Sequence, residues 1–373
     1  MINDSEAIKI NFLNRFNYPG KGNYDWEVIS SKIDSSYGGV EGRVFKGVHK
    51  DDENNTLFVK LLKIKNGNYK DILKEIYFLV LLKNNENIFV DLDDILLSNE
   101  IIYLIFKKNN TSLRQLIQYK NINYLDNKDL IKWIIYQITK GLEFLHFNNI
   151  IHNDIKPDNI LVDSKGKIFI CDFGSATYKS KKSYEFTAQY APPEFLNYII
   201  KKEKQNNIIE YNRDHKSDMW SLGVIIVELF TQKNNYFFDE NEENLTEKYV
   251  NILKNIISKF GITINENFLK NDEIDKLIND EVNINYIQLE EENINDEKAI
   301  NLIKNLLVLN PKKRFNAKQA INSDYLKDFK EFDLIEMKKI NNPLLDYNKL
   351  TNVENSKEFF ENCQILCNVL KNS

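Results

Sequence analysis

Two short polar clusters in the middle of the chain contain the side chains that phosphoryl transfer requires. The first cluster holds Asp154, Lys156 and Asn159, and the second holds Asp172. A carboxylate can orient an attacking hydroxyl, a lysine can neutralise phosphate charge, and Asp and Asn oxygens are ligands that Mg²⁺ prefers. These residue types indicate phosphoryl-transfer chemistry; a polar loop followed by an ordinary hairpin is the simpler alternative.

The segments around these clusters predict how the polar side chains are brought together. Two apolar runs, 160–162 and 167–170, are joined by Asp-Ser-Lys-Gly, which is typical of a β-hairpin turn. Because a hairpin folds back on itself, Asp154 and Asp172 would lie at the same end of it. Upstream, the apolar spacing over 126–147 predicts a helix that leads into the first cluster. Its expected core residues are Leu130, Trp133, Ile134, Ile138, Leu142 and Leu145.

The two clusters also carry a family resemblance. Residues 152–159, His-Asn-Asp-Ile-Lys-Pro-Asp-Asn, and 172–174, Asp-Phe-Gly, resemble the catalytic loop and the metal-binding motif of eukaryotic-type protein kinases in order and spacing. The resemblance implies that Asp154 is the catalytic base or hydroxyl-orienting group and that Lys156 contacts the γ-phosphate of ATP. The implied ligands of Mg²⁺, or of Mn²⁺ as an alternative, are Asn159 and Asp172.

A glycine-containing stretch near the start of the chain extends this resemblance. Residues 36–47 are similar to the kinase glycine-rich loop, in which glycines let backbone N–H groups approach phosphates. Gly39, Gly42 and Val44 occupy the second, third and valine positions, whereas Tyr37 replaces the first glycine. A plain β-hairpin is the alternative for this stretch.

A lysine and a glutamate further along are expected to pair. Lys60 ends an apolar stretch that resembles the lysine-bearing strand of the family, with Lys63 as a competitor for that role. Residues 69–83 have helical apolar spacing, and Glu75 falls on the apolar face, where an unpaired carboxylate would be costly. We therefore predict a Lys60–Glu75 ion pair, which the resemblance assigns to positioning Lys60 against the α- and β-phosphates; an exposed glutamate is the alternative.

The apolar run 101–106 predicts a strand that resembles the one entering the interlobe hinge, here 107–112. The adenine of ATP would bond to the hinge backbone, and Cys171 would line the rear of the nucleotide pocket. The cofactor contacts implied in this part of the chain are Phe106 as gatekeeper (Ile105 if the register shifts by one residue), Lys107, Asn109 and Cys171.

Residues 172–194 resemble a short activation segment closed by Pro-Pro-Glu. Thr187 matches the threonine that supports the catalytic aspartate and lysine in serine/threonine kinases, which implies Ser or Thr as phosphate acceptor. Ser183 falls where activating phosphorylation commonly occurs, although an exposed loop serine fits it as well. Asn153 stands where the family usually has an arginine, the best bidentate partner for a phosphate. We hypothesise that activity does not depend on phosphorylation of this segment.

Residues 217–230 predict a helix that is apolar nearly all round, as in a buried helix, with Ser217 and Asp218 as cap residues. The resemblance implies that Asp218 braces the catalytic-loop backbone and that Arg314 pairs with Glu194.

The implied fold is α+β and bilobal. A small lobe would contain a five-stranded antiparallel sheet and one helix, a larger lobe would be mainly helical, and ATP would bind in the cleft between them. The expected divisions are an N-terminal extension at 1–27, a kinase domain at 28–328 (small lobe about 28–106, hinge about 107–112, large lobe about 113–328, insert about 232–297) and a C-terminal extension at 329–373.

Composition narrows the class of protein. The chain has 373 residues, of which 42% are hydrophobic, and a net charge of −5 with a pI near 5.7. This charge gives no reason to expect nucleic-acid binding. Three cysteines favour a reducing compartment, and Cys363 and Cys367 are expected to pack on one helix face rather than bind metal. Since no apolar run reaches transmembrane length, we expect an intracellular protein, cytoplasmic or nuclear, that does not associate with membranes.

The sequence as a whole predicts an ATP-dependent serine/threonine protein kinase acting on protein substrates. The alternatives are a catalytically weak or silent nucleotide-binding scaffold, which Tyr37 and Asn153 would favour, and a small-molecule kinase. A regulatory partner could bind the insert or the C-terminal extension.

Overall fold

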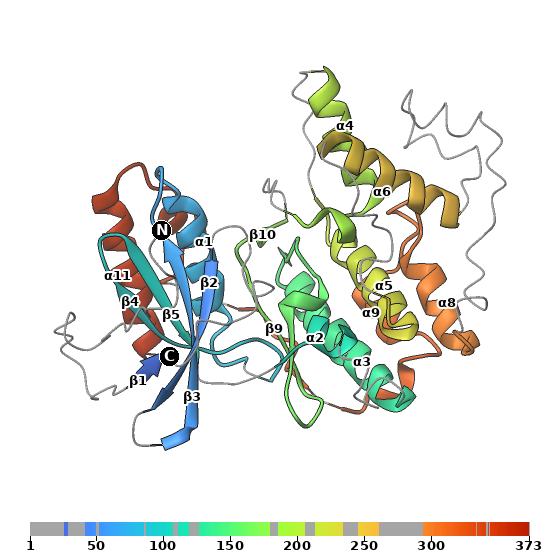
Figure 1. The fold of residues 1–373 in the computed structure, drawn as a ribbon, viewed down its shortest axis with the longest axis horizontal. Coiled ribbons are helices and arrows are strands. Elements are labelled where there is room, and N and C mark those ends of the chain that lie inside the picture. Colours follow the sequence, from blue (N-terminus) through green and yellow to red (C-terminus); the bar gives the residue numbers. More distant parts are fainter. Residues whose placement is uncertain are drawn as a thin grey trace, which may run out of the picture. The chain divides into compact units, whose positions relative to one another are not determined.

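The chain folds into two compact units, one formed by 1–110 together with 340–373 (unit 1) and the other by 111–339 (unit 2). The structure is a computed structural model that describes residues 26–28, 42–49, 52–85, 87–106, 111–118, 127–179, 186–205, 213–233, 245–260, 294–332, 334–340, 342 and 344–372. Figure 1 shows the elements in chain order.

Unit 1 is built on a five-stranded antiparallel sheet of order β1-β2-β3-β5-β4. Alternate residues of β3 and β5, among them Val59, Leu61, Tyr103 and Ile105, form a buried cluster because successive side chains of a strand point to opposite faces. The sheet and its helix α1 match the small lobe expected from the sequence. The elements are β1 Trp26–Val28, β2 Gly42–His49, β3 Asp52–Lys63, α1 Tyr69–Leu81, β4 Leu92–Leu97 and β5 Ile101–Phe106.

The end of the chain also belongs to unit 1. Helices α10 (Tyr347–Thr351) and α11 (Ser356–Asn372) pack against α1, and α11 also packs against β4 (Figure 1). Cys363 and Cys367 are buried on the packed face of α11. The stretch expected as one C-terminal extension, 329–373, is therefore divided between the units, since 329–339 belong to unit 2.

Unit 2 is mainly helical and centres on α5, whose residues 217–229 are all buried. Helix α5 contacts α3 and α8, and α4 contacts α6. The β8–β9 hairpin forms as predicted, with Ile160 opposite Ile170 and Gly166 in its turn at φ 77°. The elements are β6 Thr111–Ser112, α2 Leu113–Gln118, α3 Lys128–Phe147, β7 Ile150–Ile151, η2 Pro157–Asn159, β8 Ile160–Val162, β9 Ile168–Ile170, β10 Thr177–Tyr178, η3 Ala188–Tyr190, α4 Pro193–Gln205, α5 Lys216–Thr231, α6 Leu245–Phe260, α8 Glu297–Leu306, α9 Ala317–Ile321 and η5 Lys327–Phe329, where η marks a short 3₁₀ turn.

Two helix starts differ from the sequence prediction. Helix α3 begins two residues later than expected because the side chain of Asn127 caps it by accepting from the N–H groups of Asp129 and Leu130. The prediction that Ser217 and Asp218 cap α5 was wrong, because both lie inside its first turn and His215 precedes it. The Asp218 carboxylate instead accepts hydrogen bonds from another segment, which is described below.

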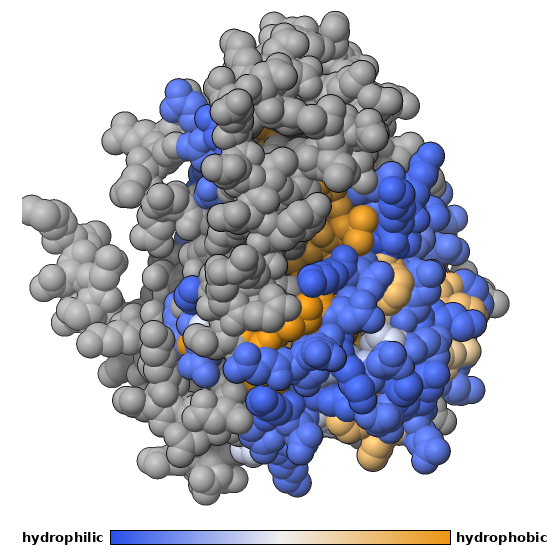
Figure 2. All heavy atoms as spheres, turned by 90° about the vertical axis from the view of Figure 1, so that its right-hand side faces the viewer, coloured by the Kyte–Doolittle hydropathy of each residue, from blue (hydrophilic) through white to orange (hydrophobic). Residues whose placement is uncertain are grey.

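The described surface of unit 2 that faces the viewer in Figure 2 is mainly hydrophilic. Within the described ranges, the structure contains no helix with the length and apolar character needed to cross a membrane.

Candidate active site

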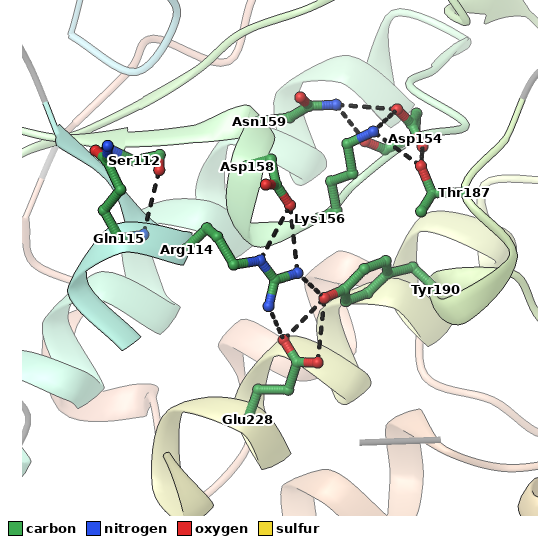
Figure 3. Close-up of polar contacts among 10 residues, drawn as sticks. All are labelled: Ser112, Arg114, Gln115, Asp154, Lys156, Asp158, Asn159, Thr187, Tyr190 and Glu228. Carbon is green, nitrogen blue, oxygen red and sulfur yellow. Dashed lines mark hydrogen bonds and ion pairs between the residues drawn. The ribbon is translucent and has the colours of Figure 1, made fainter. Parts of the chain in front are cut away.

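The centre of the site in unit 2 is the carboxylate of Asp154, which three side chains hold in place (Figure 3). Thr187 Oγ1 donates to Asp154 Oδ1 at 2.6 Å, and Lys156 Nζ lies 2.8 Å from Asp154 Oδ2. Asn159 Nδ2 donates to Asp154 Oδ2 at 3.1 Å and to the Asp154 carbonyl at 2.8 Å. Lys156 Nζ also donates to Thr187 Oγ1 at 2.8 Å, so the four side chains form one network.

The loop that carries Asp154 is anchored by the first turn of α5. The buried carboxylate of Asp218 accepts from the backbone N–H groups of His152 at 3.0 Å and Asn153 at 2.9 Å, and its Oδ2 lies 2.9 Å from His146 Nε2. Burial alone would raise the pKa of Asp218, but the hydrogen bond and charge of His146 outweigh it and lower that pKa. The carboxylate therefore acts as a fixed acceptor beneath the catalytic-loop backbone.

Lys156 carries the charge closest to Asp154. Burial disfavours its ammonium group, but the charge and hydrogen bond of Asp154, with a contribution from Asp172, raise its pKa overall. A cation is thus held beside the carboxylate, where it could contact a transferring phosphate.

Asp172 follows β9 and so lies at the same end of the β8–β9 hairpin as Asn159, which precedes β8. The backbone of Asp172 has φ 63°, a left-handed conformation that is unfavourable for a residue with a Cβ and that clusters at functional sites. The backbone N–H of its neighbour Cys171 donates to the Asn159 carbonyl at 3.0 Å, and His152 Nε2 lies 3.0 Å from the Cys171 carbonyl. The hairpin thereby links the segment before Asp172 to the catalytic loop, as its sequence predicted.

Unit 1 contains the Lys60–Glu75 ion pair. Lys60 Nζ lies 2.6 Å from Glu75 Oε1, and both side chains are largely buried. Lys60 is in the long strand β3, opposite Val44 of β2 and Leu104 of β5. Glu75 lies among the buried residues of α1, where a carboxylate needs a partner, and the predicted ion pair with Lys60 is present.

Of the other residues expected to contact ATP, the structure describes some and not others. Gly42 begins β2, Phe106 ends β5 and is half-buried, and Cys171 is half-buried. Gly39, Lys107, Asn109, Tyr37 and Ser183 lie outside the described residues.

A second polar cluster lies beside the catalytic loop and was missed by the sequence analysis. Arg114 of α2, Tyr190 of η3 and Glu228 of α5 are buried and contact one another, and Arg114 also contacts Asp158 of η2 (Figure 3). A signal was present, because Glu228 is a carboxylate inside an otherwise apolar buried helix and needs a charged partner. Nothing in the sequence indicated that the partner would be Arg114.

Two arginines brace the segments around the site. Arg314 forms the expected bidentate pair with Glu194, with both N···O distances at 2.9 Å. Arg213, which the sequence analysis did not select, donates to the Asn153 carbonyl at 3.1 Å and lies 3.7 Å over the ring of Phe195.

Within the described part of the chain, no three His, Cys, Asp or Glu side chains gather in a metal-binding group. A protein-bound Mg²⁺ commonly has one or two protein ligands and phosphate oxygens. Asn159 bonds to Asp154 through Nδ2, which directs its Oδ1, a hard oxygen ligand, away from that carboxylate. The donor set of Asn159 and Asp172 is thus compatible with a nucleotide-bound Mg²⁺.

Comparison with known proteins places these features in a family. Residues 38–326 match the model described as protein kinase domain. The chain is 30% identical to a probable serine/threonine-protein kinase of Dictyostelium discoideum, in a match that covers 88% of this chain and 50% of that protein. It is 31% identical to extracellular signal-regulated kinase 7 of Drosophila melanogaster over 69% of this chain and 28% of that protein.

Mitogen-activated protein kinase 2 of Arabidopsis thaliana is 29% identical over 77% of this chain and 74% of its own length. The chain therefore spans half or less of the first two relatives but most of the third. Together with the small antiparallel sheet, the mainly helical second unit and the two motif clusters, the match over 38–326 shows that this chain belongs to the protein kinase domain family.

Proposed function

We propose that this chain is a catalytically active kinase that transfers the γ-phosphoryl group of Mg-ATP to Ser and Thr hydroxyl groups of proteins. The observation that carries this proposal is the network in which Thr187, Lys156 and Asn159 hold the Asp154 carboxylate. The presence of these four polar side chains in one network favours an active kinase over a silent scaffold.

Asp154 is the group that would orient the acceptor hydroxyl and accept its proton. A carboxylate offers about four acceptor sites, and the three donors described above leave room for a substrate hydroxyl. Because Thr187 and Asn159 approach different oxygens, the carboxylate cannot rotate without breaking a hydrogen bond. This orientation favours in-line attack, in which positioning supplies most of the rate enhancement.

The cations of the chain would handle the phosphate charge. Lys156, adjacent to Asp154, would contact the γ-phosphoryl group, and Lys60, held by Glu75, would contact the α- and β-phosphates. Asn159 and Asp172 would hold the metal through their oxygens. The bound Mg²⁺ supplies charge neutralisation at the phosphates.

The acceptor preference follows from Thr187. Its hydroxyl contacts both Asp154 and Lys156, so the end of the activation segment contributes directly to the site. With the relatives named as serine/threonine or mitogen-activated kinases, this favours Ser and Thr over Tyr and a protein over a small molecule as substrate.

We also propose that the activation segment does not need phosphorylation. Asn153, at φ 68°, donates through Nδ2 to the Ser175 carbonyl at 3.0 Å and to Thr177 Oγ1 at 2.9 Å. The side chain at the usual arginine position therefore ties the start of the activation segment to the catalytic loop by itself, without a phosphate as an intermediary.

The test is transfer from ATP in the presence of Mg²⁺ to three matched peptides that differ only in having Ser, Thr or Tyr as acceptor. We expect transfer to Ser and Thr, little to Tyr, and loss in Asp154→Asn, which keeps the shape of the side chain but not its basicity. Transfer to Tyr alone, or to small alcohols but no peptide, would reject the acceptor assignment. Nucleotide binding without any transfer would favour the scaffold alternative.

A further inference from the structure

The turn between β3 and α1 contains an Asn-Gly pair, Asn66-Gly67, and no other glycine of the chain follows an asparagine. Both residues have left-handed backbones, Asn66 at φ 49° and Gly67 at φ 74°. The Asn68 N–H donates to the Lys65 carbonyl at 3.0 Å, which closes a type I′ turn. We propose that this pair is a site of spontaneous covalent modification, at which Asn66 is converted to aspartate and isoaspartate, and that the change loosens the start of α1.

The reaction takes place within the two residues and needs only water as a co-reactant. The backbone nitrogen of Gly67 attacks Cγ of Asn66, and a new C–N bond closes a five-membered succinimide ring. The bond from Cγ to the side-chain nitrogen breaks, and that nitrogen leaves as ammonia with the proton that the Gly67 nitrogen gives up. One water molecule then opens the ring at either carbonyl. The product is aspartate, or isoaspartate where the chain continues through the side-chain carbonyl.

The surroundings of the pair favour this reaction. Both residues are exposed, and among the residues that the structure describes, none forms a hydrogen bond with the Asn66 side chain or the Gly67 N–H. Gly67 has no side chain to shield its nitrogen, and a Cβ added there would meet nothing within 4 Å. The nitrogen and the amide are therefore adjacent and open to water, with space for Asn66 to rotate into the geometry of attack.

Two other asparagines serve as comparisons within the same chain. Asn322 and Asn355 each precede a serine, which is also a small residue. Asn322 Nδ2 donates to the Lys318 carbonyl at 2.7 Å. Asn355 Nδ2 donates to Glu358 Oε1 at 2.9 Å, and its Oδ1 accepts from the Glu358 N–H at 3.0 Å. Both side-chain amides are thus held by hydrogen bonds, unlike that of Asn66.

The turn joins the strand that carries Lys60 to the helix that carries Glu75. Asn68, which directly precedes α1, accepts from the Lys65 N–H at 2.9 Å and donates to the Lys63 carbonyl at 3.0 Å through its side chain. Isoaspartate adds one carbon to the main chain inside the turn, so the turn bond and both side-chain contacts of Asn68 cannot be kept together. The start of α1 is then held less firmly against the end of β3.

The first test follows the mass of each peptide while the native full-length chain is kept in buffer. The peptide with Asn66 should gain the mass that replaces NH2 by OH, in two forms that separate by chromatography. Conversion should be faster at higher pH, because the attacking nitrogen must lose its proton. Peptides with Asn322 and Asn355 should stay unchanged over the same time. An unchanged Asn66, or equal conversion at all three positions, would overturn the modification site.

Asn66→Gly is the matched variant, because glycine adopts positive φ readily and has no amide to lose. After the same incubation, the amides of α1 should exchange about twofold to tenfold faster in the wild type than in fresh protein, the factor that corresponds to losing one hydrogen bond. The incubated variant, and α3 of both proteins, should exchange as in fresh protein. A modified wild type with unchanged exchange of α1 would overturn the effect on the helix.

These measurements do not depend on the proposed function, because mass and hydrogen exchange are read without substrate. In an active chain, the incubated wild type should also lose transfer activity relative to the incubated variant, since α1 carries Glu75. Fresh wild type without transfer activity would overturn the proposed function alone, and the masses and exchange rates would still decide this inference.

Discussion

Removing the side chain of Phe359 should loosen α1, the helix that carries Glu75. Phe359 of α11 is fully buried, and its ring centroid lies 4.8 Å from that of Tyr69, the first residue of α1. The neighbouring helix α10 adds a second contact, since the Tyr347 ring lies 5.2 Å from that of Tyr77. The C-terminal segment thus covers α1 from its first turn to its middle.

The expected loss follows from burial. A buried aromatic side chain removes roughly 200 Å² from water, which corresponds to about 5 kcal/mol at about 25 cal/mol per Å². Alanine still buries part of this area, and neighbouring side chains move to fill part of the space. Phe359→Ala should therefore lower the free energy of unfolding of unit 1 by about 3–5 kcal/mol. Ile365→Ala is the control on the same helix. Ile365 is 38% exposed, so Ile365→Ala should cost much less than Phe359→Ala.

Amide hydrogen exchange gives the assay, because it reports stability element by element. In Phe359→Ala, exchange should become faster across α1 and α11, whereas α3 in unit 2 should exchange as in the wild type. Unchanged protection of α1, or an equal effect of Ile365→Ala, would refute the reasoning that the C-terminal segment supports the helix bearing Glu75.

Three further predictions concern the catalytic loop and its surroundings. The pKa of Asp218 is lower in the folded than in the unfolded chain, so its contribution to stability is present above the unfolded pKa, near 4, and is lost as the pH falls. The Tm of the wild type should therefore drop more steeply in acid than the Tm of Asp218→Asn. Parallel plots of Tm against pH for the two proteins would contradict this. Phosphatase treatment or Ser183→Ala should leave most of the activity, because Asn153 already ties down the activation segment; a large loss would reject the hypothesis. Half-buried Cys171 should be alkylated slowly by a nucleotide-site electrophile and protected by ATP; equal labelling with and without saturating ATP would reject its placement in the nucleotide site.

The sequence predicted the parts of the site that depend on local pattern. The turn sequence that ends at Gly166 predicted the β8–β9 hairpin, and the apolar spacing around Glu75 predicted helix α1. Both patterns involve residues that are close together in the sequence. The pairs Lys60–Glu75 and Arg314–Glu194 were also expected, the first because a buried carboxylate needs a partner and the second through the resemblance.

Features that depend on contacts between distant segments were not predictable in this way. The partner of Glu228 is Arg114, which lies in a different helix 114 residues earlier. The packing of α11 on α1 joins the end of the chain to a helix near its start, and the amphipathic pattern of α11 did not indicate which surface it covers. The role of Asp218 as a cap, expected from local propensity, was wrong, whereas its contact with the catalytic-loop backbone was expected only through the resemblance.

The most direct test of the central claim is Mg²⁺-dependent transfer of labelled phosphate from ATP to a mixed Ser/Thr peptide library, measured with Asp172→Ala as the paired variant. ATP binding to both proteins should be recorded by equilibrium titration in the same samples. The account predicts transfer by the wild type and its loss in Asp172→Ala. A wild type that binds ATP and transfers no phosphate, or a variant that transfers as fast as the wild type, would contradict it.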